Sequence, residues 1–316
     1  MRKVLLIIFS SLALFGVDYS TTFEGKRFID KMHKKYGFSK SYIRWVLSNA
    51  VHREDVLQRY NGKRKNATDF SWARYKDKIF IDESIELGKE FMRKYNYYLS
   101  KAAKRYGVSK EIITAFIRVE SKFGLYGNED RSIDVLTTLA FNPNRKQRFF
   151  RSELEKLFLV AKKSNMDILK IRGSFAGAMG CVQQMPSIYL KYGVDLDRDG
   201  VKNPNSMADC IGSIAKFLRV NGWDNSKEGV YRAKVSSKDF LKLKSGVRSR
   251  YSYSTLIKYG IYPPYKSSFY YIRLYDKYNK KYDIFLGDSN YRVITLYNYS
   301  KQYATSIALY AKELKK

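Results

Sequence analysis

Histidine and cysteine are scarce in this sequence, with two of each among 316 residues. The histidines, His33 and His52, have no nearby serine, aspartate or cysteine in a catalytic pattern. A Ser-His-Asp triad, a Cys-His pair and a histidine-ligated zinc site all need such partners. The sequence therefore gives poor support to these three kinds of site. The cysteines, Cys181 and Cys210, either pair in an oxidising compartment or remain two buried thiols, since geometry decides between these states.

Acidic residues are half as numerous as basic ones, 30 against 60, so the formal net charge is +30. This excess of positive charge favours an anionic partner, such as nucleic acid, an anionic membrane surface or an acidic polymer. Lysines are spread along the whole chain. The charge therefore indicates a polyanion without choosing among the three.

Long apolar runs are absent except at the N-terminus. Arg2 and Lys3 precede the apolar residues 4–17, a run that is short for a transmembrane helix and typical of a secretory signal. We interpret residues 1–20 as a signal peptide or, if it is retained, as an N-terminal anchor in contact with a membrane. Export makes a cell-wall polymer a better partner than nucleic acid and predicts a periplasmic location.

Helical periodicity covers most of the remaining chain, which predicts a mainly α (α+β) fold. The pattern predicts helices at residues 28–36, 84–105, 109–120, 132–140, 145–164, 211–220 and 300–314. It predicts strands at residues 269–275, 281–286 and 291–295. We divide the chain into the leader at 1–20, an N-terminal helical region at 21–105, a core at 106–228, a small β subdomain at 229–296 and a C-terminal helix within 297–316.

The predicted helix at residues 109–120 ends on an ionisable group. Its apolar face, which includes Phe116 and Ile117, continues into Glu120. A carboxylate against apolar neighbours has a raised pKa. A carboxylic acid that stays protonated near neutral pH is suited to cleaving a glycosidic bond. The alternative is a helix-end glutamate whose side chain reaches solvent.

Residues 173–180 read Gly-Ser-Phe-Ala-Gly-Ala-Met-Gly. Three glycines in eight residues indicate tight backbone packing or close approach to a ligand. The segment lacks the Gly-Lys-Ser/Thr ending of a phosphate-binding loop.

An aspartate-rich segment follows. Asp195, Asp197, Asp199 and Val201 match ligand positions of a calcium-binding loop. The usual glutamate at the twelfth position is missing, but Asp209, three residues further along, offers a closing carboxylate in a longer loop. The segment is either a cation site or a solvated turn.

Several short motifs occur in a fixed order along the chain. They are Val-Glu-Ser-Lys-Phe-Gly at 119–124, Leu-Ala-Phe-Asn at 139–142, the glycine-rich block at 173–180, Gln183 with Met-Pro-Ser at 185–187, and Gly-Trp at 222–223. Together they resemble the bacterial lytic murein transglycosylases of the membrane-bound B type, over roughly residues 25–315. The resemblance implies a lysozyme-like helical core, an N-terminal helical region, a small inserted β subdomain and a C-terminal helix that returns to the core.

The resemblance also implies an activity, cleavage of the β-1,4 bond between N-acetylmuramic acid and N-acetylglucosamine in peptidoglycan. Glu120 matches the family's single catalytic acid/base. It would protonate the glycosidic oxygen and then take the proton of the muramyl C6 hydroxyl, whose attack on C1 yields a 1,6-anhydromuramyl end. Because the substrate supplies the attacking hydroxyl, no second carboxylate is needed to activate water.

Other residues match family positions at the sugar site or facing the glycan and its peptide. They are Ser174, Gln183, Tyr75, Arg145, Lys146, Tyr189, Tyr297, Asn298 and Tyr303. Lys146 stands where the family tends to have arginine, and Phe217 stands where a tyrosine is expected. For each of these residues, a cap, a buried polar group, a core aromatic or a solvated helix start is the structural alternative.

The family's metal loop matches Asp195, Asp197, Asp199, Val201 and Asp209, which implies a structural Ca²⁺ or Na⁺, with no cofactor required for the chemistry. We therefore expect a monomeric, periplasmic lytic transglycosylase that binds peptidoglycan and no nucleic acid. The alternatives are a muramidase that hydrolyses the same bond with water, a non-catalytic peptidoglycan-binding protein and a secreted basic nucleic-acid binder.

Overall fold

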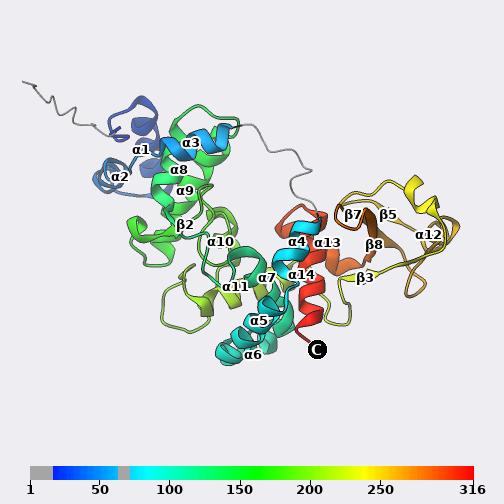
Figure 1. Cartoon of the computed structure of the whole chain (residues 1–316). Helices are drawn as coiled ribbons and strands as arrows, with labels where there is room; N and C mark the ends of the chain where they lie inside the picture. The colour runs from blue at the N-terminus through cyan, green and yellow to red at the C-terminus, as the bar shows by residue number, and fades with distance from the viewer. Residues whose placement is uncertain (1–16, 63–71) are drawn as a thin grey trace, which may run out of the picture.

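The computed structural model describes residues 17–62 and 72–316. Residues 1–16 of the predicted leader lie outside the described residues. Figure 1 shows three groups of elements in a row: a helical group at the N-terminal end, a central helical group and a β subdomain. The mainly helical fold with small sheets confirms the predicted fold class.

The N-terminal group consists of helices that come from two parts of the chain. They are α1 (Phe23–Tyr36), α2 (Lys40–Ser48), α3 (Glu54–Asn61), α8 (Ser132–Phe141) and α9 (Gln147–Lys163). α8 packs against both α3 and α9. Tyr19, which we assigned to the leader, is 2% exposed. Its hydroxyl accepts a hydrogen bond from Asn142 Nδ2 and shares another with His52 Nδ1. The packed body of the protein therefore includes residue 19.

The central group surrounds one buried helix, α7 (Lys110–Ser121). Its other helices are α4 (Trp72–Ile79), α5 (Asp82–Lys94), α6 (Asn96–Tyr106), α10 (Pro186–Tyr192), α11 (Met207–Val220), α13 (Ser289–Tyr297) and α14 (Lys301–Glu313). The 3-10 turn η2 (Ile168–Lys170) packs instead against α8 and α9 of the N-terminal group, and α10 also packs against α9. α5, α6, α11 and α14 all pack against α7. Two short strands, β1 (Asp130–Arg131) and β2 (Arg172–Gly173), pair with each other, and β1 packs against α8. The C-terminal helix thus returns to the centre of the molecule.

The predicted single helix at residues 84–105 is wrong. The structure has two helices there, α5 and α6, which are separated at Tyr95, a residue with φ −105° and ψ 20°. Tyr95 packs its ring 4.7 Å from that of Phe91, which in turn stacks 4.9 Å from Phe123. Tertiary packing turns the chain at this point, and no glycine or proline marks the break in the sequence.

The β subdomain is an antiparallel sheet of four strands in the order β3-β8-β7-β5. Its strands are β3 (Val230–Arg232), β5 (Arg250–Tyr251), β7 (Phe269–Asp276) and β8 (Lys281–Gly287), and β4 (Lys234–Val235) pairs with β6 (Ile261–Tyr262) beside it. The subdomain also contains η3 (Lys238–Lys242) and α12 (Tyr253–Lys258). A small separate core, which includes Phe269, Tyr271 and Leu286, holds it together.

The strands predicted at residues 269–275 and 281–286 are confirmed, whereas the strand at 291–295 is wrong. Those residues form α13, which begins where the Asp288 side chain accepts a hydrogen bond from the Asn290 amide. Tyr291, Val293 and Ile294 are all buried. The alternation of apolar residues there reflects a helix enclosed on several sides.

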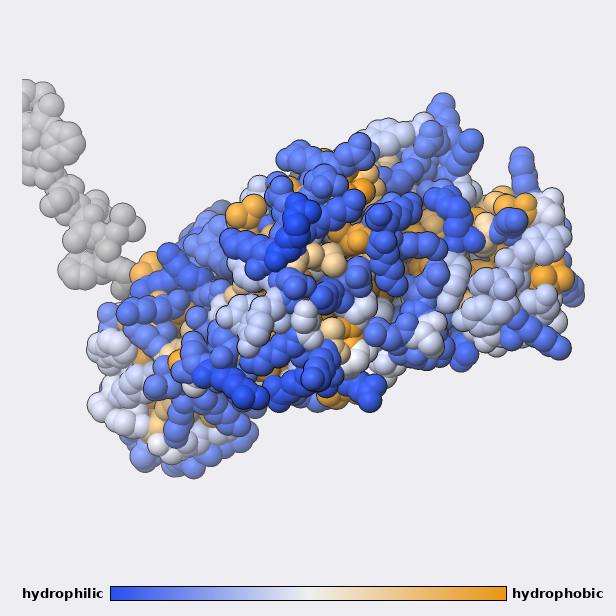
Figure 2. All heavy atoms as spheres, turned by 90° about the horizontal axis from the view of Figure 1, so that it is seen from below, coloured by the Kyte–Doolittle hydropathy of each residue, from blue (hydrophilic) through white to orange (hydrophobic). Residues whose placement is uncertain are grey.

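The surface is strongly polar. Figure 2, seen from below, shows mostly hydrophilic residues with small scattered apolar areas. None of the helices in residues 17–62 and 72–316 is both long and apolar enough to cross a bilayer.

Candidate active site

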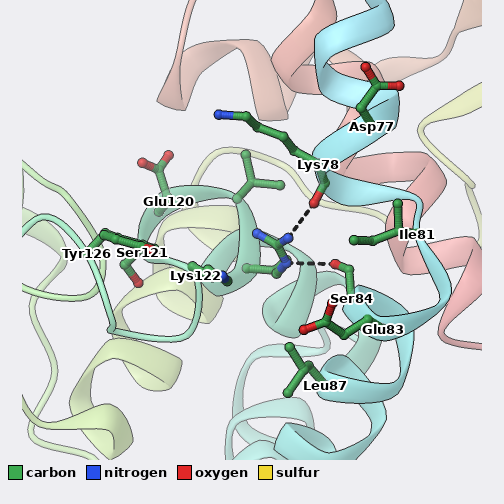
Figure 3. A pocket seen from close by; sticks show the side chains of 12 residues that line it. Asp77, Lys78, Ile81, Glu83, Ser84, Leu87, Glu120, Ser121, Lys122 and Tyr126 are labelled. Carbon is green, nitrogen blue, oxygen red and sulfur yellow. Dashed lines mark hydrogen bonds between the residues drawn. The ribbon is translucent and has the colours of Figure 1, made fainter.

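Glu120 lies in the last turn of α7, and its side chain lines a pocket. Residues 112–118 of this helix are buried, whereas the Glu120 side chain is partly exposed. The pocket has a volume of about 460 Å³ (Figure 3). Its lining residues come from α4, α5 and the end of α7: Asp77, Lys78, Ile81, Glu83, Ser84, Leu87, Arg118, Val119, Glu120, Ser121, Lys122 and Tyr126.

The chain turns sharply directly after Glu120. Lys122, Phe123 and Gly124 have φ values of 48°, 62° and 86°, all in the left-handed region that non-glycine residues rarely adopt. Ser121 holds this turn, because its Oγ accepts the Gly124 N–H at 2.9 Å and donates to the Cys181 carbonyl at 2.9 Å. Strained backbone of this kind persists where surrounding contacts enforce it. The segment after the glycine-rich block therefore fixes the end of the Glu120 helix.

Burial raises the pKa of Glu120 to about 8. A hydrogen bond from the Tyr303 hydroxyl to its Oε1 acts in the opposite direction and lowers the pKa. The side chain is partly exposed as a whole, but its carboxyl group is desolvated by the surrounding protein. Glu120 is therefore mostly protonated at pH 7, as the sequence pattern predicts.

Three of the tyrosines predicted to line the site gather around Glu120. Tyr303 bonds to it directly, and the Tyr297 hydroxyl donates to the carbonyl of Val182. Burial, and then the charge of Glu120, raise the pKa of both Tyr75 and Tyr297. Phe217, which replaces an expected tyrosine, packs its ring 4.8 Å from that of Tyr297.

Gln183 and Ser174 make contacts that shape the backbone of the site. The Gln183 side-chain amide donates to the carbonyls of Gly127 and Gly180, each at 2.8 Å. The Ser174 hydroxyl accepts the Ala178 N–H at 3.3 Å inside the glycine-rich block. A Cβ on Gly180 would lie 1.8 Å from the Pro204 carbonyl oxygen. The close backbone packing expected of this block is therefore present.

Among the described residues, Glu120 is the only predicted site residue in the lining of this pocket. Arg145 and Lys146 are exposed at the start of α9, where Arg145 lies over the Tyr60 ring at 4.7 Å. Asn298 is exposed at the end of α13. Tyr189 is buried beside Asp209. The structure thus brings part of the predicted set together and leaves these four elsewhere.

Two buried polar residues, Arg118 and Gln184, belong to none of the predicted site positions. Arg118 is buried on α7, and its guanidinium donates to Ser84 Oγ at 2.8 Å and to the Lys78 carbonyl at 2.5 Å (Figure 3). Gln184 is 3% exposed, and neither amide atom has a hydrogen-bond partner among the described residues. Only the position of Arg118, two residues before Glu120, hinted at its role in the pocket wall.

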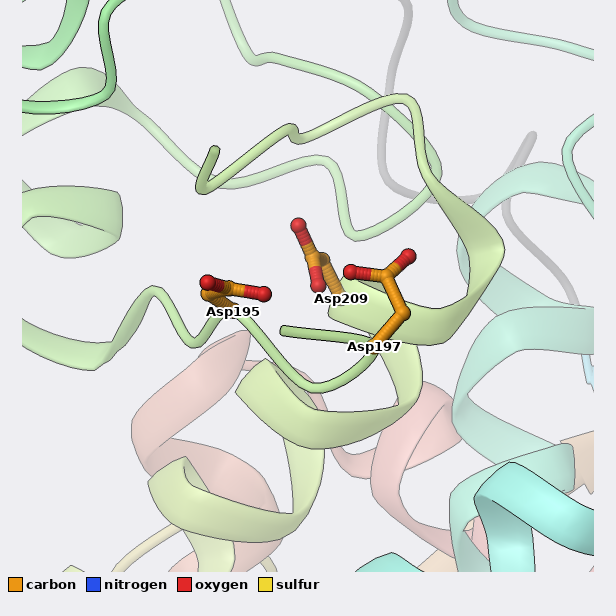
Figure 4. A group of neighbouring side chains, drawn as sticks. All are labelled: Asp195, Asp197 and Asp209. Atoms are coloured by element: carbon orange, nitrogen blue, oxygen red, sulfur yellow. The ribbon is translucent and has the colours of Figure 1, made fainter. Parts of the chain in front are cut away.

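The aspartate-rich segment brings three carboxylates together. Oxygen atoms of Asp195, Asp197 and Asp209 all lie within 4.8 Å of one another, and the side chains converge in Figure 4. Oδ1 of Asp197 is buried without a partner among the described residues. Burial raises the pKa of Asp209 to about 6. Asp199 lies outside this group, and its carboxylate accepts the Val201 N–H at 2.7 Å. Such clustered oxygen donors fit a calcium ion.

The two cysteines, whose state the sequence left open, form a disulfide. Cys181 follows the glycine-rich block, and Cys210 follows Asp209 on α11. The Cys181 N–H also donates to the Pro204 carbonyl at 3.1 Å. The disulfide therefore joins the segment that holds Ser121 to the segment that carries the aspartate cluster.

The sequence and fold match known proteins over nearly the whole chain. Residues 22–312 match the family model described as "Transglycosylase SLT domain". The membrane-bound lytic murein transglycosylase B of Escherichia coli is 33% identical over 301 residues, which cover 92% of this chain and 82% of that protein. The structure of the E. coli lytic transglycosylase SLT35 in complex with calcium has a TM-score of 0.85 at 32% identity and covers 95% of each chain.

The soluble lytic transglycosylase SltB1 of Pseudomonas aeruginosa also has a TM-score of 0.85, at 30% identity over 91% of this chain and 97% of that one. These matches extend across all three groups of elements in Figure 1. This chain belongs to the lytic murein transglycosylases of the transglycosylase SLT family.

Proposed function

We propose that this protein is a peptidoglycan lytic transglycosylase in which Glu120 alone acts as acid and then as base. The observation that carries the proposal is the environment of Glu120: a carboxyl group with a pKa of about 8, partly open to a pocket and hydrogen-bonded by Tyr303. A group in this state donates a proton readily at neutral pH. Family membership supplies the substrate, the glycan strand of murein.

In the first step, Glu120 transfers its proton to the oxygen of the bond between N-acetylmuramic acid and N-acetylglucosamine, and that bond breaks. The carboxylate that remains takes the proton of the muramyl C6 hydroxyl. The C6 oxygen then bonds to C1, which closes a 1,6-anhydro ring and returns Glu120 to its protonated form. Between the two steps, the Tyr303 hydroxyl stabilises the carboxylate by donating a hydrogen bond to Oε1.

The arrangement of the other acidic residues favours this route over hydrolysis. A two-carboxylate glycosidase places its second carboxylate close to the first to act as a nucleophile or to activate water. Asp77 and Glu83 also line the pocket, but in Figure 3 both lie apart from Glu120, Asp77 on α4 and Glu83 on α5. An attacking hydroxyl that belongs to the substrate removes the need for such a partner. A muramidase acting on the same bond is the second candidate.

Tyr75, Tyr297, Ser174 and Gln183 support this site in our proposal. Tyr75 and Tyr297 lie close enough to Glu120 for its charge to raise their pKa, and Gln183 bonds to the Gly127 carbonyl in the segment after α7. Arg145 and Lys146, exposed on α9, are positioned to meet substrate groups that lie further from the cleaved bond. We assign Asn298 and Tyr189 no direct contact with the sugar at Glu120.

Asp195, Asp197 and Asp209 would hold a calcium ion in our proposal. The converging oxygens and the unpartnered Asp197 Oδ1 support this assignment, and the related SLT35 has a structure in complex with calcium. The ion would stabilise the fold, since Asp209 also accepts the backbone N–H groups of Leu196 and Asn203. The chemistry at Glu120 needs no metal in this scheme.

The periplasm is the proposed location. The apolar residues 4–17 supply an export signal or anchor. The Cys181–Cys210 disulfide fits an oxidising compartment. The relative in E. coli is described as a membrane-bound enzyme that acts on murein.

Digestion of purified sacculi tests the proposal. The products are separated and weighed by mass spectrometry. A lytic transglycosylase releases 1,6-anhydromuramyl ends, which are lighter by one water than the reducing ends that a muramidase releases. Anhydro products from the wild type support the mechanism, whereas reducing ends alone would assign the protein to the muramidases. Release of no products would leave a non-catalytic peptidoglycan-binding protein.

A further inference from the structure

An exposed group of tyrosines lies at the end of the β subdomain, outside the site described above. We call residues 275–282, which join β7 to β8, the tyrosine hairpin. Tyr275 and Tyr282 face each other across the two strands, and their ring centroids are 5.1 Å apart. These side chains are 47% and 44% exposed, and Tyr278 in the turn is 62% exposed. Three large aromatic rings in solvent at one hairpin indicate a binding surface.

The hairpin is held rigidly by the helix on its other face. Trp72 Nε1 on α4 donates to Asp283 at 2.7 Å, and Lys76 forms an ion pair with Asp276. Asp276 in turn accepts hydrogen bonds from the Tyr278 N–H at 3.0 Å and from Asn279 Nδ2 at 2.8 Å. The turn is therefore ordered before any ligand arrives, which lowers the entropy cost of binding.

The charged residues in the hairpin and in the adjoining parts of β7 and β8 are divided between the two faces of the strands. Its acidic residues bond to basic partners on neighbouring elements, Asp276 to Lys76 and Asp283 to Arg232 on β3. On the solvent side, cations lie against the rings instead. Arg273 lies 5.3 Å from the Tyr282 ring centroid, and Lys277 lies 5.4 Å from that of Tyr278. The exposed surface thus combines aromatic rings with positive charge.

The hairpin lies beside the catalytic pocket. α4, the helix that anchors it, also contributes Asp77 and Lys78 to the lining of the pocket that contains Glu120. Tyr278, in the turn of the hairpin, lies within reach of Asp77, whose side chain raises the pKa of the Tyr278 hydroxyl. Tyr275 and Tyr282 alternate with Asp276 and Asp283, which face α4, so the two tyrosine rings lie on the opposite face of the strands. A polymer that leaves the pocket at Asp77 would pass Tyr278 in the turn before it meets these two rings.

We propose that the tyrosine hairpin is an outer sugar-binding surface that holds the same glycan strand beyond the bond being cleaved. The tyrosine rings would stack on the apolar faces of sugar units. Arg273 and Lys277 would face the carboxylates that a murein strand carries. A peptidoglycan strand offers both sugar rings in a row and carboxylate groups. A neutral glycan lacks the negative charge, and an anionic lipid surface lacks the row of sugar rings. This inference rests on the proposed function for the identity of the strand.

Binding measurements in the Glu120→Gln background test the proposal, because that variant would hold the strand without cutting it. The variant Tyr275→Ala/Tyr278→Ala/Tyr282→Ala is compared with its parent for binding to glycan strands from which the stem peptides have been removed. We expect about tenfold weaker binding, which corresponds to about 1.4 kcal/mol. The matching triple phenylalanine variant keeps the rings and should bind as the parent does. Tyr262→Ala removes an exposed tyrosine on β6 and should have no effect.

In the catalytically active protein, the triple alanine variant should lose activity on long strands and keep it on a soluble tetrasaccharide that is too short to reach the hairpin. Binding of long strands within twofold of the parent would overturn the proposal, and so would an equal loss for Tyr262→Ala. If the triple alanine variant does not fold, Tyr278→Ala alone is tested. We expect it to bind glycan strands about threefold more weakly, and an unchanged affinity would contradict the proposal. Absence of activity in the wild type on sacculi would instead contradict the proposed function.

Discussion

The Tyr303 hydroxyl donates a hydrogen bond to Glu120 Oε1, although 183 positions separate the two residues in the chain. Each side chain projects from the end of a helix that packs against the other, Glu120 from the last turn of α7 and Tyr303 from the first turn of α14. Ser300 caps α14 by accepting the Tyr303 N–H at 3.2 Å. The C-terminal helix thus completes the environment of the proposed acid.

Tyr303→Phe tests this contact. The bond lowers the pKa of Glu120, so its removal should raise that pKa and shift the alkaline limb of the pH–rate profile to higher pH. Loss of one hydrogen bond to a charged group should also slow turnover by about tenfold or more. The measurement is the pH dependence of sacculus digestion. Tyr291→Phe is the control, because that buried hydroxyl has no partner among the described residues. A slower enzyme with an unmoved alkaline limb would contradict the assigned role.

Glu120→Gln should make the protein more stable at alkaline pH. The folded-state pKa of about 8 lies above the ordinary value of 4.5, so the folded state binds more protons than the unfolded state between these pH values. The wild type therefore loses stability as the pH rises from about 4.5 to 8. Glutamine does not ionise and avoids this loss, which is on the order of a few kcal/mol.

Melting temperatures of both proteins, measured from pH 5 to pH 9, check this expectation. The difference in favour of Glu120→Gln should grow with pH and level off above about 8. A constant difference across this range would mean that Glu120 titrates as an ordinary exposed glutamate.

Calcium should raise the melting temperature of the wild type. Ligand binding to the folded state alone stabilises by about 2.7 kcal/mol when free calcium is 100 times its Kd. Asp197→Ala should abolish the shift, because the Asp197 carboxylate belongs to the converging cluster. Asp199→Ala is the matched control and should keep most of it, since Asp199 lies outside the cluster. An equal loss in both variants would contradict the three-aspartate site.

Removal of the disulfide should weaken both the fold and the site. A crosslink that closes a loop of this length, with a sequence separation of 29, stabilises a protein by about 2–4 kcal/mol. Cys181→Ser/Cys210→Ser should lower the melting temperature and also reduce turnover at temperatures where the variant is folded, because Ser121 bonds to the backbone of Cys181. Unfolding curves measure the loss of stability, and rates of sacculus digestion measure the loss of turnover. Unchanged turnover would assign the disulfide a purely stabilising role.

Local chemistry made much of the fold and part of the site predictable. The helices expected at residues 28–36 and 109–120 are present as α1 and α7. Glu120 was identified because it interrupts an apolar helix face. The break at Tyr95 and the helical state of residues 291–295 were missed, because tertiary packing decides both.

The same limit applies to the site. Motif order pointed to Tyr303 and Tyr75, but the pocket wall from α4 and α5 carries no motif. Arg118 and Gln184 acquire their surroundings only when α7 and the segment after the glycine-rich block are packed. Likewise, a one-dimensional loop pattern placed Asp199 among the metal ligands, whereas the backbone path directs its carboxylate to Val201.

The rate at which Glu120→Gln solubilises purified sacculi, compared with the wild type at equal concentrations of folded protein, tests the central claim most directly. General acid–base catalysis by a placed side chain contributes about 10²–10⁴-fold. We predict a loss in this range or greater, a folded variant, and wild-type activity that declines above pH 8 as Glu120 loses its proton. Glu120→Gln turnover within a factor of two of the wild type would show that another group supplies the proton.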